Sequence, residues 1–75
     1  MKRPANPMPD DVAQALVREG LVGLYQDRPW YQRNDYLGWI SRAKRADTRI
    51  KRVQQMLDEL RAGDRYMKMV WRAKR

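Results

Sequence analysis

Apolar residues recur every three or four positions along three stretches of the chain, and this spacing places side chains on one face of an α-helix. The stripe of the first stretch is formed by Val12, Ala13, Leu16 and Val17. Pro9 suits the first helical turn, because the N–H group that proline lacks has no helical partner there, and Gly20 suits the C-terminal end. The first stretch therefore predicts a helix from about residue 9 to Gly20.

The second stretch opens at Pro29 and predicts a helix that continues to about Ala43. Its apolar face consists of Tyr36, Leu37, Ile40 and Ala43, with Trp39 at the border. Gly38 lies in the middle of this helix, where glycine costs about 1 kcal/mol relative to alanine. We therefore expect another backbone to approach closely at Gly38.

The third stretch predicts a helix that begins at Ala46 or Asp47 and ends at Gly63. Its apolar seam consists of Ile50, Val53, Leu57 and Leu60, with Met56 beside it. Only a few residues join this helix to the preceding one, so the two helices must be antiparallel or sharply crossed neighbours.

The remaining segments carry weaker patterns. Residues 21–26 are short and apolar and predict a single helical turn or a short helix. Residues 1–8, with prolines at positions 4 and 7, predict a flexible tail. Residues 64–75 form a basic amphipathic segment that fits a short helix or an extended chain, and we favour a loosely held helix or tail.

The predicted fold is all-α, a small bundle of three to four helices over residues 9–63 with a tail on either side. At 75 residues the chain is near the lower limit for a domain that folds alone, so its core must be compact. The predicted core consists of Leu16, Tyr36, Leu37, Ile40, Ile50, Val53, Leu57 and Leu60.

Composition excludes several kinds of chemistry. The sequence has no cysteine and no histidine, which excludes disulfides, thiolate zinc sites and imidazole catalysis. Ser41 and Thr48 have no neighbouring base to activate them, so we expect a protein that is not an enzyme and has no metal or cofactor. Its basic start lacks the apolar run of a secretory signal, and no segment is long enough to span a membrane. We expect a cytoplasmic protein.

Positive charge is the strongest chemical signal in the sequence. Seventeen Lys and Arg residues against nine Asp and Glu residues give a net charge of +8, which attracts polyanions and acidic protein surfaces. Much of this charge gathers where the second and third predicted helices meet. The candidate anion-binding or partner-binding residues are Arg42, Lys44, Arg45, Thr48, Arg49, Lys51 and Arg52.

Two structural hypotheses compete for this basic joint. The free N–H groups at the start of the third helix favour binding of an anion, and Arg45 and Arg49 flank this helix start. Asp47, however, is placed to fill that site from within by capping the helix and pairing with Arg49 or its neighbours, and we favour this internal arrangement. A helix-turn-helix is a further alternative, in which Gln54 and Gln55 are the only good candidates for reading base edges.

A second candidate contact lies near the C-terminus, where Trp71 and Arg72 follow a methionine-rich stretch. A tryptophan beside basic residues suits an anionic membrane surface or another chain. Covering the open end of a small core is the simpler role, and we favour it.

The spaced motifs of the central stretch resemble a known family. The motifs are Trp39-Ile40, Ala43-Lys44-Arg45, Asp47-Thr48-Arg49 and Lys51-Arg52, followed by a helix that closes at Gly63. Together they resemble the C-terminal signature of the bacteriocin-protection, YdeI or OmpD-associated family over residues 9–63, although Ala46 and Asp47 stand where that family has proline and glutamate. The resemblance implies an all-helical bacterial domain linked by name to tolerance of bacteriocins or cationic antimicrobial peptides, and it supplies no catalytic residues.

Two functions follow as expectations. The first is a small helical interaction module whose partner is another protein or peptide. The alternative is a basic nucleic-acid or anion binder that makes mostly nonspecific phosphate contacts.

Overall fold

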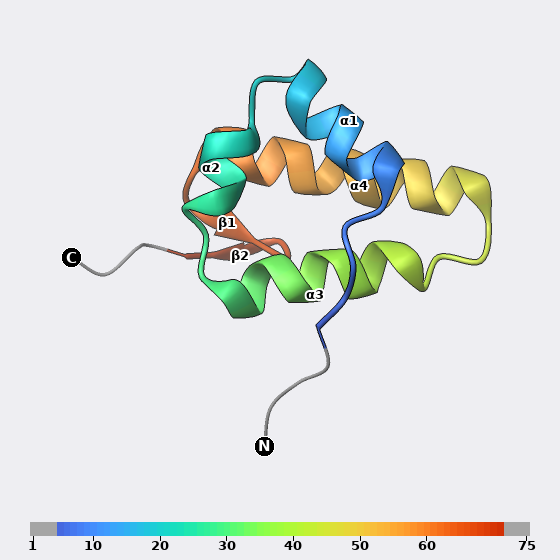
Figure 1. Ribbon diagram of the computed structural model, residues 1–75. Coiled ribbons are helices and arrows are strands. Elements are labelled where there is room, and N and C mark those ends of the chain that lie inside the picture. Colours follow the sequence, from blue (N-terminus) through green and yellow to red (C-terminus); the bar gives the residue numbers. More distant parts are fainter. Residues whose placement is uncertain (1–4, 72–75) are drawn as a thin grey trace.

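The computed structural model describes residues 5–71, which form four helices followed by a short β-hairpin (Figure 1). The helices are α1 (Asp10–Arg18), α2 (Val22–Gln26), α3 (Trp30–Ser41) and α4 (Ala46–Ala62), and the strands are β1 (Arg65–Tyr66) and β2 (Met69–Val70). The two strands pair antiparallel. The fold is therefore mostly helical, and the all-α prediction is corrected by the small sheet.

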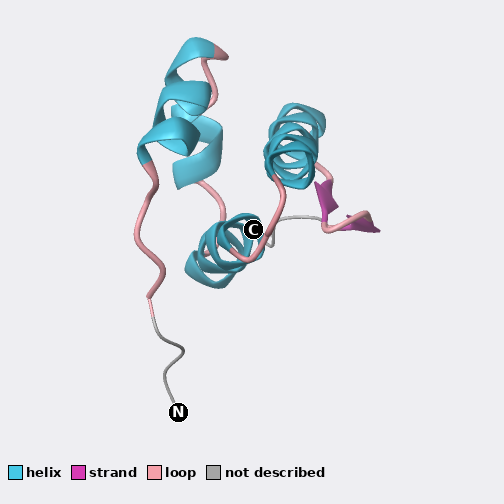
Figure 2. Ribbon diagram, turned by 90° about the vertical axis from the view of Figure 1, so that its right-hand side faces the viewer, coloured by secondary structure: helices cyan, strands magenta, loops and turns pink. Residues whose placement is uncertain are grey.

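The helices α3 and α4 run side by side in opposite directions, as their short connection requires (Figure 1). Viewed along these two helices, α1 and α2 lie on one side and the hairpin lies on the other (Figure 2). The core fills the space between the helices, and its buried apolar residues are Val12, Ala15, Leu16, Leu21, Tyr25, Tyr36, Leu37, Ile40, Met56, Leu57 and Leu60.

Helix ends lie close to the predicted positions because proline and glycine set them. Pro9 and Pro29 directly precede α1 and α3 with extended backbone. Gly20 and Gly63 follow α1 and α4 with φ of 69° and 81°, a left-handed conformation that glycine adopts without strain. The predicted short helix over residues 21–26 is α2.

Three predicted apolar positions differ from the structure. Ile50 was predicted to lie in the core but is 69% exposed, and Val17 of the predicted apolar stripe is 70% exposed. Val53 is only partly buried against the core. The first turns of α4 project beyond α1 in Figure 1. The buried part of α4 is its C-terminal half, around Met56 and Leu60.

The N-terminal segment is attached to α3 at Asn6, which corrects the predicted flexible tail at this position. The Asn6 backbone N–H donates to Asn34 Oδ1 (2.7 Å), and the Asn6 side-chain amide donates to Asn34 O (3.0 Å) and Oδ1 (3.1 Å). A Cβ atom on Gly38 would lie 2.8 Å from Asn6 Nδ2. The close approach expected at Gly38 is therefore made by the Asn6 side chain, while residues 1–4 of the predicted tail lie outside the described part of the chain.

The hairpin replaces the helix or tail predicted after Gly63. Arg65 is opposite Val70 and Tyr66 is opposite Met69, so only Met67 and Lys68 form the turn. Both turn residues have positive φ, 50° and 66°, as a two-residue hairpin of this type requires. Neither residue is the glycine or asparagine that usually occupies such a turn, so other contacts must stabilise it.

Candidate functional site

The basic joint, residues 42–45 and the first turns of α4, contains cations in three different situations. Arg42, Lys44 and Lys51 are exposed, and none of them has an ion-pair partner within residues 5–71. Arg45 Nε pairs with Asp47 Oδ1 at 3.2 Å, and both side chains remain exposed. These positions leave most of the charge of the joint available to a partner.

Arg49 is engaged in contacts within the protein. Its Nε and Nη2 atoms donate to the two carboxylate oxygens of Asp11 on α1, at 2.9 and 3.0 Å, and its Nη1 atom lies 3.5 Å from Ile40 O. These hydrogen bonds hold the pKa of Asp11 below its usual value. Arg49 therefore attaches α1 to α4 instead of flanking an external anion with Arg45.

Two more of the predicted site residues are also used internally. Arg52 Nη1 donates to Trp39 O at 2.6 Å, and the guanidinium carbon lies 5.2 Å from the centroid of the Trp39 ring. Such a contact between a cation and an aromatic ring is attractive. Thr48 is partly buried, and its backbone N–H donates to Asp47 Oδ1 at 2.9 Å. Arg52 thus stabilises the packing of α3 against α4.

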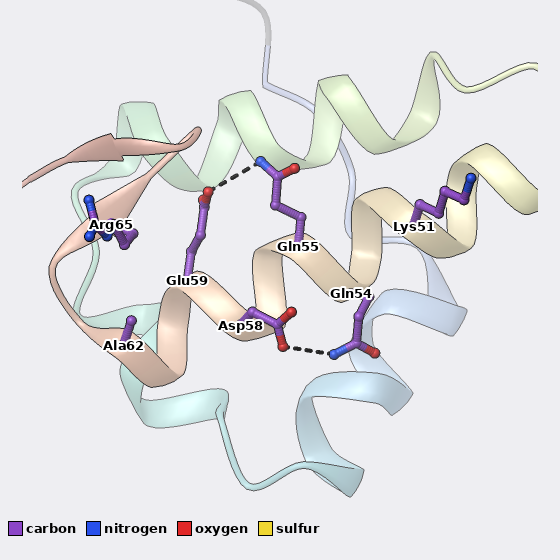
Figure 3. Close-up of a pocket in the computed structure, with 7 residues that line it drawn as sticks. All are labelled: Lys51, Gln54, Gln55, Asp58, Glu59, Ala62 and Arg65. Carbon is purple, nitrogen blue, oxygen red and sulfur yellow. Dashed lines mark hydrogen bonds between the residues drawn. The ribbon is translucent and has the colours of Figure 1, made fainter.

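The outer face of α4 bears a broad pocket of about 530 Å³ with Lys51 towards one end and Arg65 towards the other (Figure 3). The amides of Gln54 and Gln55 point to acidic neighbours on the same helix. Gln54 Nε2 donates to Asp58 Oδ1 (2.9 Å), and Gln55 Nε2 donates to Glu59 Oε2 (3.2 Å). Both glutamines that the helix-turn-helix alternative requires are therefore hydrogen-bonded to carboxylates.

A narrower groove of about 250 Å³ lies between α1 and α4. Its lining is Asp11, Ala15, Arg18, Arg49, Ile50, Val53, Gln54 and Leu57. The Asp11–Arg49 pair joins the helices near their N-terminal ends, and Glu19 pairs with Arg61 near their C-terminal ends. Half of the lining residues are apolar, and ion pairs join the two helices of the groove near both ends.

Trp71, the second candidate contact residue, packs against a buried arginine. The guanidinium carbon of Arg28, which is only 5% exposed, lies 4.6 Å from the centroid of the Trp71 ring. Arg28 donates to Gln32 Oε1 (3.0 Å), Arg65 O (2.7 Å) and Glu59 O (2.9 Å). Trp71 thus covers a buried cation that joins α3, α4 and β1, while Arg72 lies outside the described residues.

The buried carboxylate of Glu59 was not predicted from the sequence. It accepts hydrogen bonds from the Tyr36 hydroxyl and from the backbone N–H groups of Met67 (2.8 Å) and Lys68 (2.7 Å). Burial and the neighbouring Glu59 raise the pKa of Tyr36 well above its usual value, so its hydroxyl stays protonated and donates. One sequence signal existed, since Glu59 stands between Met56 and Leu60 on the apolar face of the helix.

Two features bear on the class of protein. Within residues 5–71, no helix is long and apolar enough to cross a membrane, and no group of three or more acidic residues is arranged to hold a metal ion. The fold and the site together define a small, mostly helical domain with an exposed basic joint.

Comparison with known families makes the assignment specific. The chain belongs to the OmdA family, described as bacteriocin-protection, YdeI or OmpD-associated, whose model matches residues 6–63. The match includes the Asn6 attachment and all four helices, and it ends at Gly63 before the hairpin. No curated protein and no solved structure matches the chain.

Proposed function

We propose that this protein is a non-enzymatic interaction module that binds a protein or peptide partner at its basic joint. The observation that carries the proposal is that Arg42, Lys44 and Lys51 are exposed without an ion pair among residues 5–71, and that Ile50 of the same joint exposes an apolar side chain. A surface that combines unpaired charge with exposed apolar area suits a protein partner. The family description, which names bacteriocin protection, supports a role in tolerance of bacteriocins.

The internal contacts of α4 favour this proposal over sequence-specific DNA binding. A recognition helix needs free side chains that can reach base edges. Arg49 is bonded to Asp11, Arg52 to the Trp39 carbonyl, and Gln54 to Asp58. Reading a base would require these internal hydrogen bonds to break.

Nonspecific phosphate binding is the second candidate function, and the same unpaired cations favour it. A net charge of +8 attracts any polyanion, and phosphate contacts require no particular geometry. Binding of this kind weakens steeply as salt rises, with a slope that reflects the number of phosphates contacted. A partner that also buries apolar surface retains affinity at physiological salt.

A double charge reversal tests the proposal. The variant Arg42→Glu/Lys44→Glu alters only exposed side chains, so we expect its thermal unfolding to match that of the parent within a few degrees. We expect it to lose capture of the partner at physiological salt and to abolish bacteriocin tolerance in cells that depend on the protein. Both are measured in parallel with the parent.

The matched control is Arg65→Glu/Lys68→Glu, which reverses the same number of charges on exposed side chains at the hairpin end. We expect this control to retain partner capture and tolerance. If both double variants lose capture equally, only net charge matters and the joint is not the binding site. If the joint variant retains both properties, the proposal is wrong.

A further inference from the structure

The groove between α1 and α4 points to the chemistry of the partner. We infer that it receives one large apolar side chain from an acidic segment of that partner, an inference that rests on the proposed function. An engineered cavity of about 150 Å³ is large enough to bind benzene. The groove, at about 250 Å³, can therefore accommodate a leucine or phenylalanine side chain.

The walls of the groove favour an apolar occupant. Ala15, Val53 and Leu57 line it and are buried or partly buried, whereas Ile50 lines the same groove and is 69% exposed. Apolar surface that meets water at a concave site is stabilised when a ligand covers it. Ile50 thus adds exposed apolar surface that an incoming side chain can contact.

Charge around the groove selects an acidic partner. The one carboxylate among its lining residues, Asp11, is neutralised by its ion pair with Arg49. Three other cations of the joint, Arg42, Lys44 and Lys51, have no ion-pair partner within residues 5–71, so the uncompensated charge there is positive. A second copy of this chain also carries +8 and is repelled, which makes an acidic segment the complementary occupant.

The groove is also formed in advance of binding. Ion pairs join α1 to α4 at both of its ends, Asp11 with Arg49 and Glu19 with Arg61. A site whose walls are already positioned loses less conformational entropy when a ligand binds. This favours recognition of a short segment that contributes a single apolar side chain.

The test uses two short synthetic peptides of aspartate and glutamate that differ only at the central residue, leucine in one and serine in the other. We expect the leucine peptide to bind at least about tenfold more tightly, because its side chain leaves water. Saturable shifts of the Ala15, Val53 and Leu57 methyl signals in NMR spectra would locate it in the groove.

Two exposed apolar residues provide a matched pair of variants. Ile50→Ser is expected to remove most of the preference for leucine, whereas Val17→Ser should preserve it, because Val17 is 70% exposed but does not line the groove. Circular dichroism should show both variants folded.

The outcomes separate the inference from the proposed function. Equal affinities for the two peptides, both lost in Arg42→Glu/Lys44→Glu, would overturn the groove inference and leave the basic joint as a protein-binding site. Tighter binding of a short DNA duplex than of either peptide at physiological salt would overturn both. A leucine preference that Ile50→Ser leaves intact would place the apolar contact elsewhere and would also overturn the inference.

Discussion

Glu59→Ala is expected to detach the C-terminal hairpin and to lower the free energy of unfolding by about 2–4 kcal/mol. The Glu59 side chain is only 6% exposed, and it accepts hydrogen bonds from Tyr36, Gln55 and the turn N–H groups of Met67 and Lys68. Its removal leaves these donors without an acceptor, and a buried donor without a partner is costly. Chemical denaturation measures the loss.

The turn makes this carboxylate more important, because Met67 and Lys68 both have positive φ. A left-handed conformation costs a residue other than glycine roughly 1–2 kcal/mol, so the two hydrogen bonds from Glu59 offset local strain. Asp58→Ala is the matched control, since the neighbouring Asp58 carboxylate is exposed and, among residues 5–71, contacts the exposed side chains of Gln54 and Arg61. Equal stability of the two alanine variants would show that Glu59 does not hold the hairpin.

Leu57→Ala is expected to cost about 2–5 kcal/mol, while Ile50→Ala on the same helix should change stability by less than about 0.5 kcal/mol. Leu57 is 3% exposed, so truncation leaves a cavity in the core, whereas Ile50 is 69% exposed and its truncation leaves none. Thermal unfolding of the two variants beside the parent provides the measurement. Similar losses in both variants would contradict the exposed position of Ile50.

The contrast between these two residues shows what periodicity can predict. Spacings of three and four residues placed Ile50 and Leu57 on one face of a helix, and α4 is a helix as predicted. Periodicity does not reveal how far a neighbouring helix extends along that face. The exposure of Ile50 depends on which other elements pack against the start of α4, which is a tertiary property.

Helix boundaries were predictable because they depend on local chemistry, such as Pro29 before α3 and Gly63 after α4. The hairpin was not predictable, because its turn lacks glycine and asparagine and is stabilised by a carboxylate eight and nine residues earlier in the chain. A turn of this kind has no short sequence signal.

The candidate site was predictable only in part. The cluster of cations at the joint was evident from the sequence, and Arg42, Lys44, Arg45 and Lys51 are exposed there. The internal use of Arg49 was not evident, because its partner Asp11 lies 38 positions earlier in the chain. Only the three-dimensional structure shows which cations are used in long-range pairs of this kind and which are available to bind a partner.

The most direct test of the central claim is capture of the partner from an extract of the native cell, with and without nuclease, at physiological salt. If the protein is a protein-binding module, one partner protein should remain bound after nuclease treatment. It should be retained by Arg65→Glu/Lys68→Glu and lost by Arg42→Glu/Lys44→Glu. Captured material that disappears with nuclease, or that binds both double variants equally, would contradict the account.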